Sequence, residues 1–121
     1  MHKVNISEVP SRQRNGLTSY ILLQHEDIPG SNLSVTWVNI AKGSSQKPHS
    51  HYPEQSYIII HGQGNIFIGN ERTSVEKGDL VYIPSNVIHY IENTGDNSLI
   101  YISTATPSYN FTNMYDAGDL S

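Results

Sequence analysis

Two histidine-bearing segments decide the fold of this chain: GSSQKPHSHYPEQ at residues 43–55 and GDLVYIPSNVIH at residues 78–89. On an extended strand, His49 and His51 point to the same face with Cα atoms roughly 6–7 Å apart. Both imidazoles can then reach one metal ion at about 2.0–2.1 Å. Gln55 adds a neutral oxygen donor, and His89 arrives from a neighbouring strand. The predicted metal ligands are therefore His49, His51, Gln55 and His89.

The composition favours a single β-rich domain and excludes several classes of function. The chain has 121 residues, of which 36% are hydrophobic and only 15% are charged, and its length suits one domain. Seven Lys and Arg residues form no run, and the net charge is −4, so nucleic-acid binding has no electrostatic support. No apolar stretch of about 18 residues is present. Cysteine is absent, so a metal must use nitrogen and oxygen ligands.

Short runs of β-forming residues alternate with turn signals along the chain, which favours a sandwich or barrel. We expect eight strands, at residues 18–24, 33–41, 57–60, 65–69, 73–76, 80–83, 89–92 and 98–104. Asn15-Gly16 and Gly69-Asn70 are the strongest turn signals. Residues 1–16 form an N-terminal arm that either pairs with a neighbouring strand or partner subunit, or is loosely held. The barrel spans 17–107, and the tail 108–121 either wraps the surface or forms a short helix.

The two segments resemble the paired motifs of the cupin superfamily. The first family pattern is G-x5-H-x-H-x3,4-E-x6-G and the second is G-x5-P-x-G-x2-H-x3-N, and every spacing matches between Gly43 and Asn93. Two positions depart from the patterns: Gln55 replaces the ligand glutamate, and Asn86 replaces a glycine. Asn tolerates positive φ better than most residues, so the second change is mild. The resemblance implies an all-β, antiparallel barrel of the jelly-roll type with one metal inside, and a homodimer.

The fourth ligand is open between two neighbouring residues. Strand alternation and the six-residue spacing to Gly62 favour Gln55, whereas a shift of register would bring in Glu54. A set of three imidazoles and one amide leaves the charge of a divalent ion uncompensated, which makes the ion a stronger Lewis acid. The donors suit one divalent transition metal ion, Zn, Ni, Mn or Fe, without choosing among them.

A general acid or base is expected inside the same cavity. Tyr57 shares strand parity with Gln55 and is the candidate, against the alternative that it is only a core aromatic. Glu54 and His61 are weaker candidates. Tyr82 and Tyr90 can lie on either face of their strands, and no arginine is tied to the site by sequence.

These residues predict a metal-dependent enzyme acting on a small oxygen-rich molecule of sugar, uronate or polyketide type, by isomerisation, ring opening or closure, or cyclisation. A metal-dependent dioxygenase and a non-enzymatic binding or sensor module remain as alternatives. We expect a cytoplasmic protein with a small-molecule substrate, a homodimeric state, and neither nucleic acid nor membrane as a partner.

Overall fold

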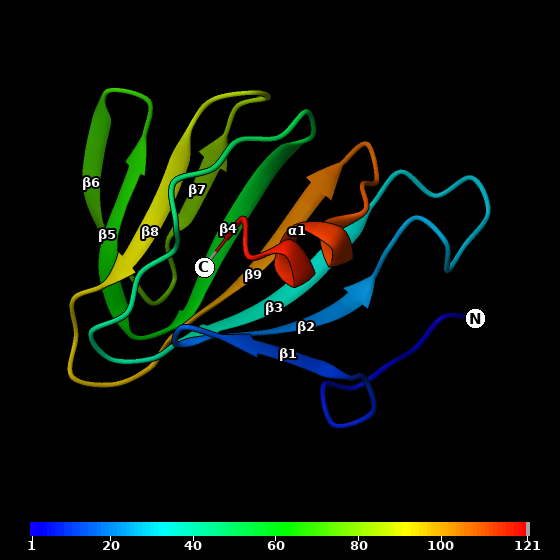
Figure 1. The fold of residues 1–121 in the computed structure, drawn as a ribbon, viewed down its shortest axis with the longest axis horizontal. Helices are drawn as coiled ribbons and strands as arrows, with labels where there is room; N and C mark the ends of the chain where they lie inside the picture. The colour runs from blue at the N-terminus through cyan, green and yellow to red at the C-terminus, as the bar shows by residue number, and fades with distance from the viewer. Residues whose placement is uncertain (121) are drawn as a thin grey trace.

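The computed structural model describes residues 1–120, which form two antiparallel sheets that face each other (Figure 1). The large sheet has the strand order β1-β2-β3-β9-β4-β7. Its strands are β1 (Ser11–Arg14), β2 (Leu17–Leu23), β3 (Ser34–Ile40), β9 (Leu99–Thr106), β4 (Glu54–His61) and β7 (Leu80–Ile83). The small sheet has the order β6-β5-β8, with β6 (Glu71–Glu76), β5 (Gln63–Ile68) and β8 (His89–Asn93). The predicted all-β barrel of the jelly-roll type is confirmed.

The alternation of buried and exposed side chains sets the inner face of each strand. In β3 and β9 every second residue is buried, and the intervening residues are half-buried on the outer face. The buried apolar residues of both sheets form one core, which contains Leu17, Val38, Ile40, Tyr57, Ile59, Ile66, Val75, Ile83, Ile91, Leu99, Tyr101 and Leu120. The space between the sheets is therefore a packed interior, into which the histidines project from one end.

Two tight turns follow from residues that accept positive φ. Asn15 and Gly16 have φ values of 49° and 85° and join β1 to β2, as a two-residue hairpin turn with positive φ at both positions requires. Asn86 has a φ of 62°, a left-handed conformation that glycine adopts readily and that Asn tolerates. The turn that carries His89 toward the site therefore forms without glycine at this position.

Several strands are longer than predicted, and three of the differences bear on the site. β4 begins at Glu54, where the sequence placed its start at Tyr57, because its first residues pair with both β7 and β9. β1 is an additional strand within the N-terminal arm and pairs with β2 of the same chain. β9 continues to Thr106 through its pairing with Glu54. The extension of β4 matters most, because it puts Gln55 on a regular strand.

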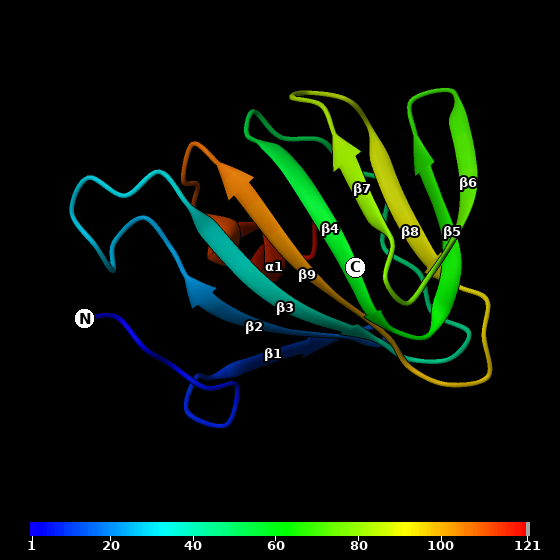
Figure 2. The ribbon, with the colours of Figure 1, turned by 180° about the vertical axis from the view of Figure 1, so that it is seen from behind.

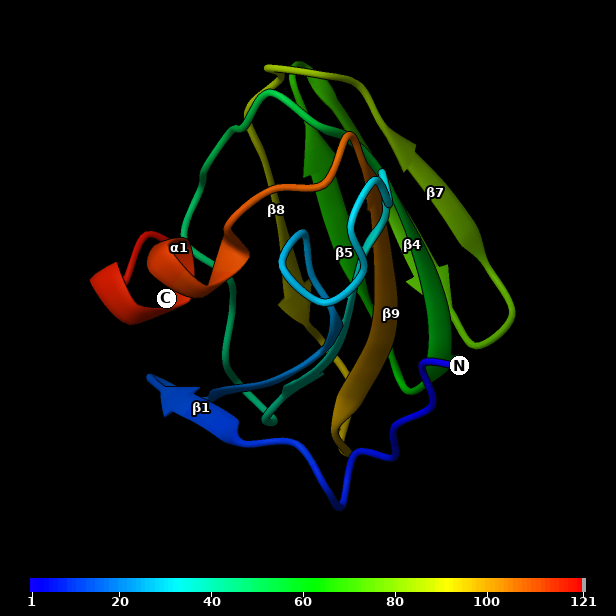
Figure 3. The ribbon, with the colours of Figure 1, turned by 90° about the vertical axis from the view of Figure 1, so that its right-hand side faces the viewer.

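The C-terminal tail contains a short helix, α1 (Phe111–Ala117). Asn110 caps its first turn by accepting a hydrogen bond from the Asn113 amide, and Gly118 ends it in the left-handed conformation. The helix lies beside the opening of the barrel, between β1 and β8 (Figure 3). Seen from behind, the outer face of the large sheet is in front, and α1 lies behind it, partly visible between β3 and β9 (Figure 2).

Within residues 1–120, no helix has the length and apolar character that crossing a membrane requires.

Candidate metal centre

Three histidines converge inside the barrel. His49 lies in the loop between β3 and β4, and it exchanges both backbone hydrogen bonds with His89 at the start of β8. The side chains of His49, His51 and His89 are 9%, 6% and 1% exposed. One ring nitrogen of each lies within 4.8 Å of the others. Three buried imidazoles at this separation can bind one metal ion.

The backbone fixes the orientation of all three rings. Nδ1 of His49 lies 2.7 Å from the Lys47 carbonyl oxygen, and Nδ1 of His51 lies 2.9 Å from that of Pro53. Nδ1 of His89 lies 2.9 Å from the carbonyl oxygen of Val87. A carbonyl only accepts, so each Nδ1 carries the proton and each Nε2 keeps its lone pair. Metal-binding histidines are commonly held by this kind of second contact.

Burial favours the neutral form of all three rings. Burial lowers the pKa of His49 to about 3, with the nearby His89 adding to the effect. Burial likewise lowers the pKa of His89 to about 4, and it lowers the pKa of His51. In addition, Nε2 of His89 is buried with no hydrogen-bond partner in the described structure. Such an orphaned acceptor is costly unless another group uses its lone pair.

Gln55 and Glu54 point to opposite faces of β4. Gln55 is 6% exposed, and its Oε1 lies 3.0 Å from Nε2 of His51. Its Nε2 donates to Ser103 Oγ at 2.5 Å, which directs Oε1 toward the histidines. Glu54 is exposed, and it accepts a hydrogen bond from Tyr82 outside the barrel at 3.4 Å. Of the two alternatives, only the Gln55 side chain lies next to the cluster.

Tyr57 lies on the same inner face as Gln55 and is 1% exposed. Its ring centroid is 6.3 Å from that of His89, and it stacks on Tyr101 at 4.1 Å. The Gln46 amide donates to the hydroxyls of both tyrosines and accepts from the amide of Ile91. Burial raises the pKa of Tyr57, so its phenol stays protonated at neutral pH.

The weaker acid–base candidates lie away from the histidines. His61 is exposed at the far end of β4, with Nδ1 2.9 Å from the Ser98 carbonyl. Tyr82 is 54% exposed on the outer face of β7. Tyr90 lies on the outer face of β8 and stacks on Phe67 with ring centroids 4.3 Å apart.

Several residues beside the cluster were missed by the sequence analysis. Ser103 orients Gln55, and Gln46 organises the tyrosine pair. Ser103 has inward parity in its predicted strand, and Gln46 lies inside the first motif, but neither position has a distinctive residue type. Tyr109 and Phe111 of the tail approach His51, with ring centroids 6.4 Å and 5.2 Å away. No spacing rule links a tail residue to a motif about sixty positions earlier.

Two facing antiparallel sheets with three inward histidines define a β-barrel with a candidate metal centre. A family model described as Cupin domain matches residues 36–105. The chain therefore belongs to the cupin family, as its motifs predicted.

Similar proteins agree with this fold. An uncharacterised protein of Methanocaldococcus jannaschii is 36% identical over 89 residues, which are 72% of this chain and 71% of that protein. The crystal structure of a predicted oxalate decarboxylase from Thermotoga maritima matches with a TM-score of 0.78 at 24% identity, over 87% of this chain and 98% of that one. The polyketide cyclase RemF from Streptomyces resistomycificus matches with a TM-score of 0.75 at 17% identity, over 89% and 80% of the two chains. At these identities, the structural likeness shows the fold alone.

Proposed function

We propose that the chain is a metal-dependent enzyme that holds one divalent transition metal ion with His49, His51, His89 and Gln55. The substrate is a small oxygen-rich molecule, and the reaction is an isomerisation, a ring opening or closure, or a cyclisation. The bound ion would supply Lewis acidity, which polarises a carbonyl or hydroxyl group of the substrate.

The orientation of the three imidazoles carries this proposal. Each ring has its Nδ1 proton held by a backbone carbonyl, so the lone pairs left over are those of Nε2. His51 Nε2 faces Gln55 Oε1 at 3.0 Å, which brings together two groups that both donate electron pairs. Two neighbouring ligands of one ion, each about 2.1 Å from it at right angles, would lie about 3 Å apart. The arrangement therefore fits a shared cation.

The uncharged ligand set indicates how the centre would act. Three imidazoles and an amide offset none of the positive charge of a divalent ion, whereas a carboxylate would offset one unit. Burial strengthens the attraction of that charge for an anionic oxygen. An acidic enol, hydroxyl or carboxylate of a substrate would therefore bind directly at the centre. The folds of a polyketide cyclase and of a predicted oxalate decarboxylase give support to small oxygen-rich substrates.

Tyr57 is the proposed proton donor. Its raised pKa, which burial causes, makes it a neutral acid. Gln46 donates to its hydroxyl at 3.2 Å, so this contact leaves the phenolic proton free for transfer to another acceptor. A phenol in this position suits protonation of an enolate-like oxygen or carbon.

We also propose a homodimer formed through the outer face of the large sheet. Ile58 pairs with Leu80 and with Ile102 across neighbouring strands, so their side chains form one apolar row. Ile58 and Leu80 are 43% and 63% exposed, and Tyr82 beside them is 54% exposed. Apolar side chains gathered on one sheet face commonly mark a protein contact.

Elemental analysis of the purified protein, followed by oxygen measurement, tests the reaction class. One equivalent of a divalent ion, with turnover unchanged under anaerobic conditions, is the expected result. Consumption of dioxygen in step with substrate would instead support a dioxygenase, because three imidazoles with open positions also suit iron. Tight ligand binding without any turnover would support a binding or sensor module.

A further inference from the structure

The C-terminal segment, residues 108–120, places two aromatic rings over the histidine cluster; these two rings are called the roof below. The Phe111 ring meets His51 edge-on, with centroids 5.2 Å apart and planes at 87°. The Tyr109 ring lies 6.4 Å from the same imidazole and 5.3 Å from Phe111. Phe111 is only 6% exposed, so it fills space inside the barrel opening. Both rings therefore lie next to the proposed centre.

The roof is attached differently from the other walls of the cluster. His89 and Gln55 lie on strands paired along their lengths, and the loop of His49 is tied to β8 by backbone hydrogen bonds. The tail instead belongs to no strand ladder, and it is held by apolar packing and by individual hydrogen bonds. The Tyr109 amide donates to Ser34 Oγ of β3 at 3.0 Å. Ser108 Oγ donates to the Ser31 carbonyl at 3.2 Å, and Thr112 Oγ1 donates to Gln24 Oε1 at 3.0 Å. Segments outside the strand pairings generally open at a lower free energy than the central strands of a sheet.

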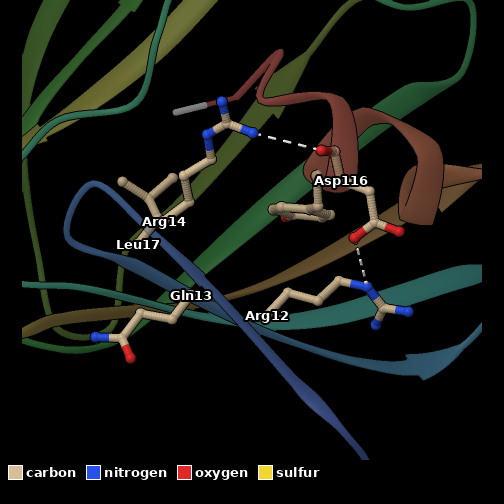
Figure 4. Close-up of a pocket in the computed structure, with 6 residues that line it drawn as sticks. Arg12, Gln13, Arg14, Leu17 and Asp116 are labelled. Atoms are coloured by element: carbon tan, nitrogen blue, oxygen red, sulfur yellow. Dashed lines mark hydrogen bonds and ion pairs between the residues drawn. The ribbon is translucent and has the colours of Figure 1, made fainter.

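Two arginines of β1 hold the far end of α1 (Figure 4). Arg12 Nε donates to the Asp116 carboxylate at 3.1 Å, and Arg14 Nη1 donates to the backbone carbonyl of Asp116 at 3.4 Å. A pocket of about 250 Å³ lies between the strand and the helix, lined also by Tyr115. The Arg12 and Asp116 side chains are 31% and 58% exposed, so the contact is accessible to water. An ion pair of this kind can separate without burying a charge.

We propose that residues 108–120 are a cover that opens to admit the substrate, and that Phe111 and Tyr109 are its specificity-determining residues. The inference rests on the proposed function, because it assigns the cover to that same site. A substrate at the histidine cluster must displace or contact both rings. These rings therefore favour a molecule that presents a flat or apolar side next to its metal-binding oxygens. The Arg12–Asp116 pair is the latch that biases the cover toward its closed position.

The tail is the side of the cluster that can move without disturbing the proposed ligands or the strand pairings. Moving the loop that carries His49 and His51 would dismantle the ligand set. Moving β4 or β8 would break the pairings that hold Gln55 and His89. Displacing the tail withdraws Phe111 and Leu120, which are 6% and 3% exposed, from apolar packing, and it breaks the backbone hydrogen bond from Lys47 to the Leu120 carbonyl. It breaks no strand pairing and moves none of the proposed ligands. The route of least disruption therefore passes under α1.

Chemical modification of the metal-free full-length protein tests the cover without knowledge of substrate or metal. Diethyl pyrocarbonate modifies accessible neutral imidazoles, and peptide mass mapping gives the rate at each histidine. The exposed His61 serves as the internal reference. The variants are Asp116→Asn at the latch and Phe111→Ala in the roof. The control is Asp96→Asn, which weakens a similar exposed contact with Lys42 at 3.8 Å.

In the roof and latch variants, modification of His51 should be faster than in the wild type, with each rate taken relative to that of His61. Asp116→Asn should accelerate it about twofold to fivefold, the range for loss of an exposed ion pair. Phe111→Ala should accelerate it about tenfold or more, because a buried aromatic ring is lost. Asp96→Asn should leave the rate unchanged. Hydrogen exchange of the β9 amides should stay at the wild-type rate in all variants.

Two results would refute the proposal that residues 108–120 cover the site. Unchanged modification of His51 in both roof and latch variants would show that access does not pass under the tail. Acceleration accompanied by equally faster exchange in β9 would show general unfolding instead. Failure of the protein to bind metal would refute the proposed function without affecting this readout. Unchanged His51 rates in a protein that binds metal would refute the cover alone.

Discussion

Replacing Gln55 by alanine should weaken metal binding far more than replacing its neighbour Glu54. The Gln55 side chain is 6% exposed, with Oε1 3.0 Å from Nε2 of His51. Glu54 points outward and makes one contact of 3.4 Å with Tyr82. The two positions are adjacent in sequence and differ mainly in the face that they occupy. They therefore form a matched pair for separating a ligand from a bystander.

The expected losses of metal affinity differ by roughly one order of magnitude between the two variants. Loss of a residue that merely supports a ligand typically weakens metal affinity about 10–100-fold, so loss of a ligand should reach or exceed that range. An effect of this size corresponds to about 1.4–2.7 kcal/mol or more. For Glu54→Ala we expect a change within about 0.5 kcal/mol, as for surface substitutions generally. Gln55→Glu should bind the ion at least as tightly as the wild type, because it adds a compensating charge.

The assay is competition for the metal between each protein and a coloured chelator, with dissociation constants measured at one pH. Urea unfolding of the metal-free variants provides the control for stability, since Gln55→Ala also removes the hydrogen bond to Ser103. Equal losses of affinity in the Gln55→Ala and Glu54→Ala variants would refute the assignment of Gln55. Weaker binding by Gln55→Glu than by the wild type would count against the argument from charge.

Three further predictions concern stability, association and the proposed acid. Because the pKa values of His49 and His89 fall from 6.5 to about 3 and about 4 on folding, the unfolded chain binds more protons at low pH. The free energy of unfolding of the metal-free protein should therefore fall by about 3 kcal/mol for each ring as the pH falls from 6.5 to 4. A free energy of urea unfolding that does not change in this pH window would contradict the prediction. Leu80→Lys should convert the proposed dimer to a monomer in sedimentation velocity, and a monomeric wild type would exclude the dimer. Tyr57→Phe should keep full metal content and lower unfolding free energy by about 1 kcal/mol, the value of one hydrogen bond; loss of the metal would show that Tyr57 has a different role.

The sequence predicted the barrel because its signals are local. The alternation of apolar residues, the glycines of the two motifs and the turn at Asn15-Gly16 each act within a few positions. The inward side of β4 also followed from parity, and the structure places the Gln55 and Glu54 side chains on the faces that parity predicts. The convergence of the three histidines followed from two spaced motifs. Within the cluster, the ligand roles and the catalytic role of Tyr57 stay predictions.

The surroundings of the site depended on contacts between distant segments. Ser103 contacts Gln55 across 48 positions, and Gln46 reaches Tyr101 across 55. The approach of Phe111 to His51 depends on how the tail returns over the barrel opening, which no local pattern specifies. The contact of Arg12 with Asp116 spans 104 positions, and no local pattern links the two residues. Such pairings become visible only after the fold has brought the segments together.

The metal content of the His89→Ala variant tests the central claim most directly. His89 is 1% exposed, and its Nε2 has no hydrogen-bond partner in the described residues, so a bound ion is the partner that the account assigns to it. Elemental analysis should find one equivalent of a divalent transition metal in the wild type and almost none in the folded variant. Full occupancy in His89→Ala, or a wild type that retains no ion after growth with added metal, would contradict the account.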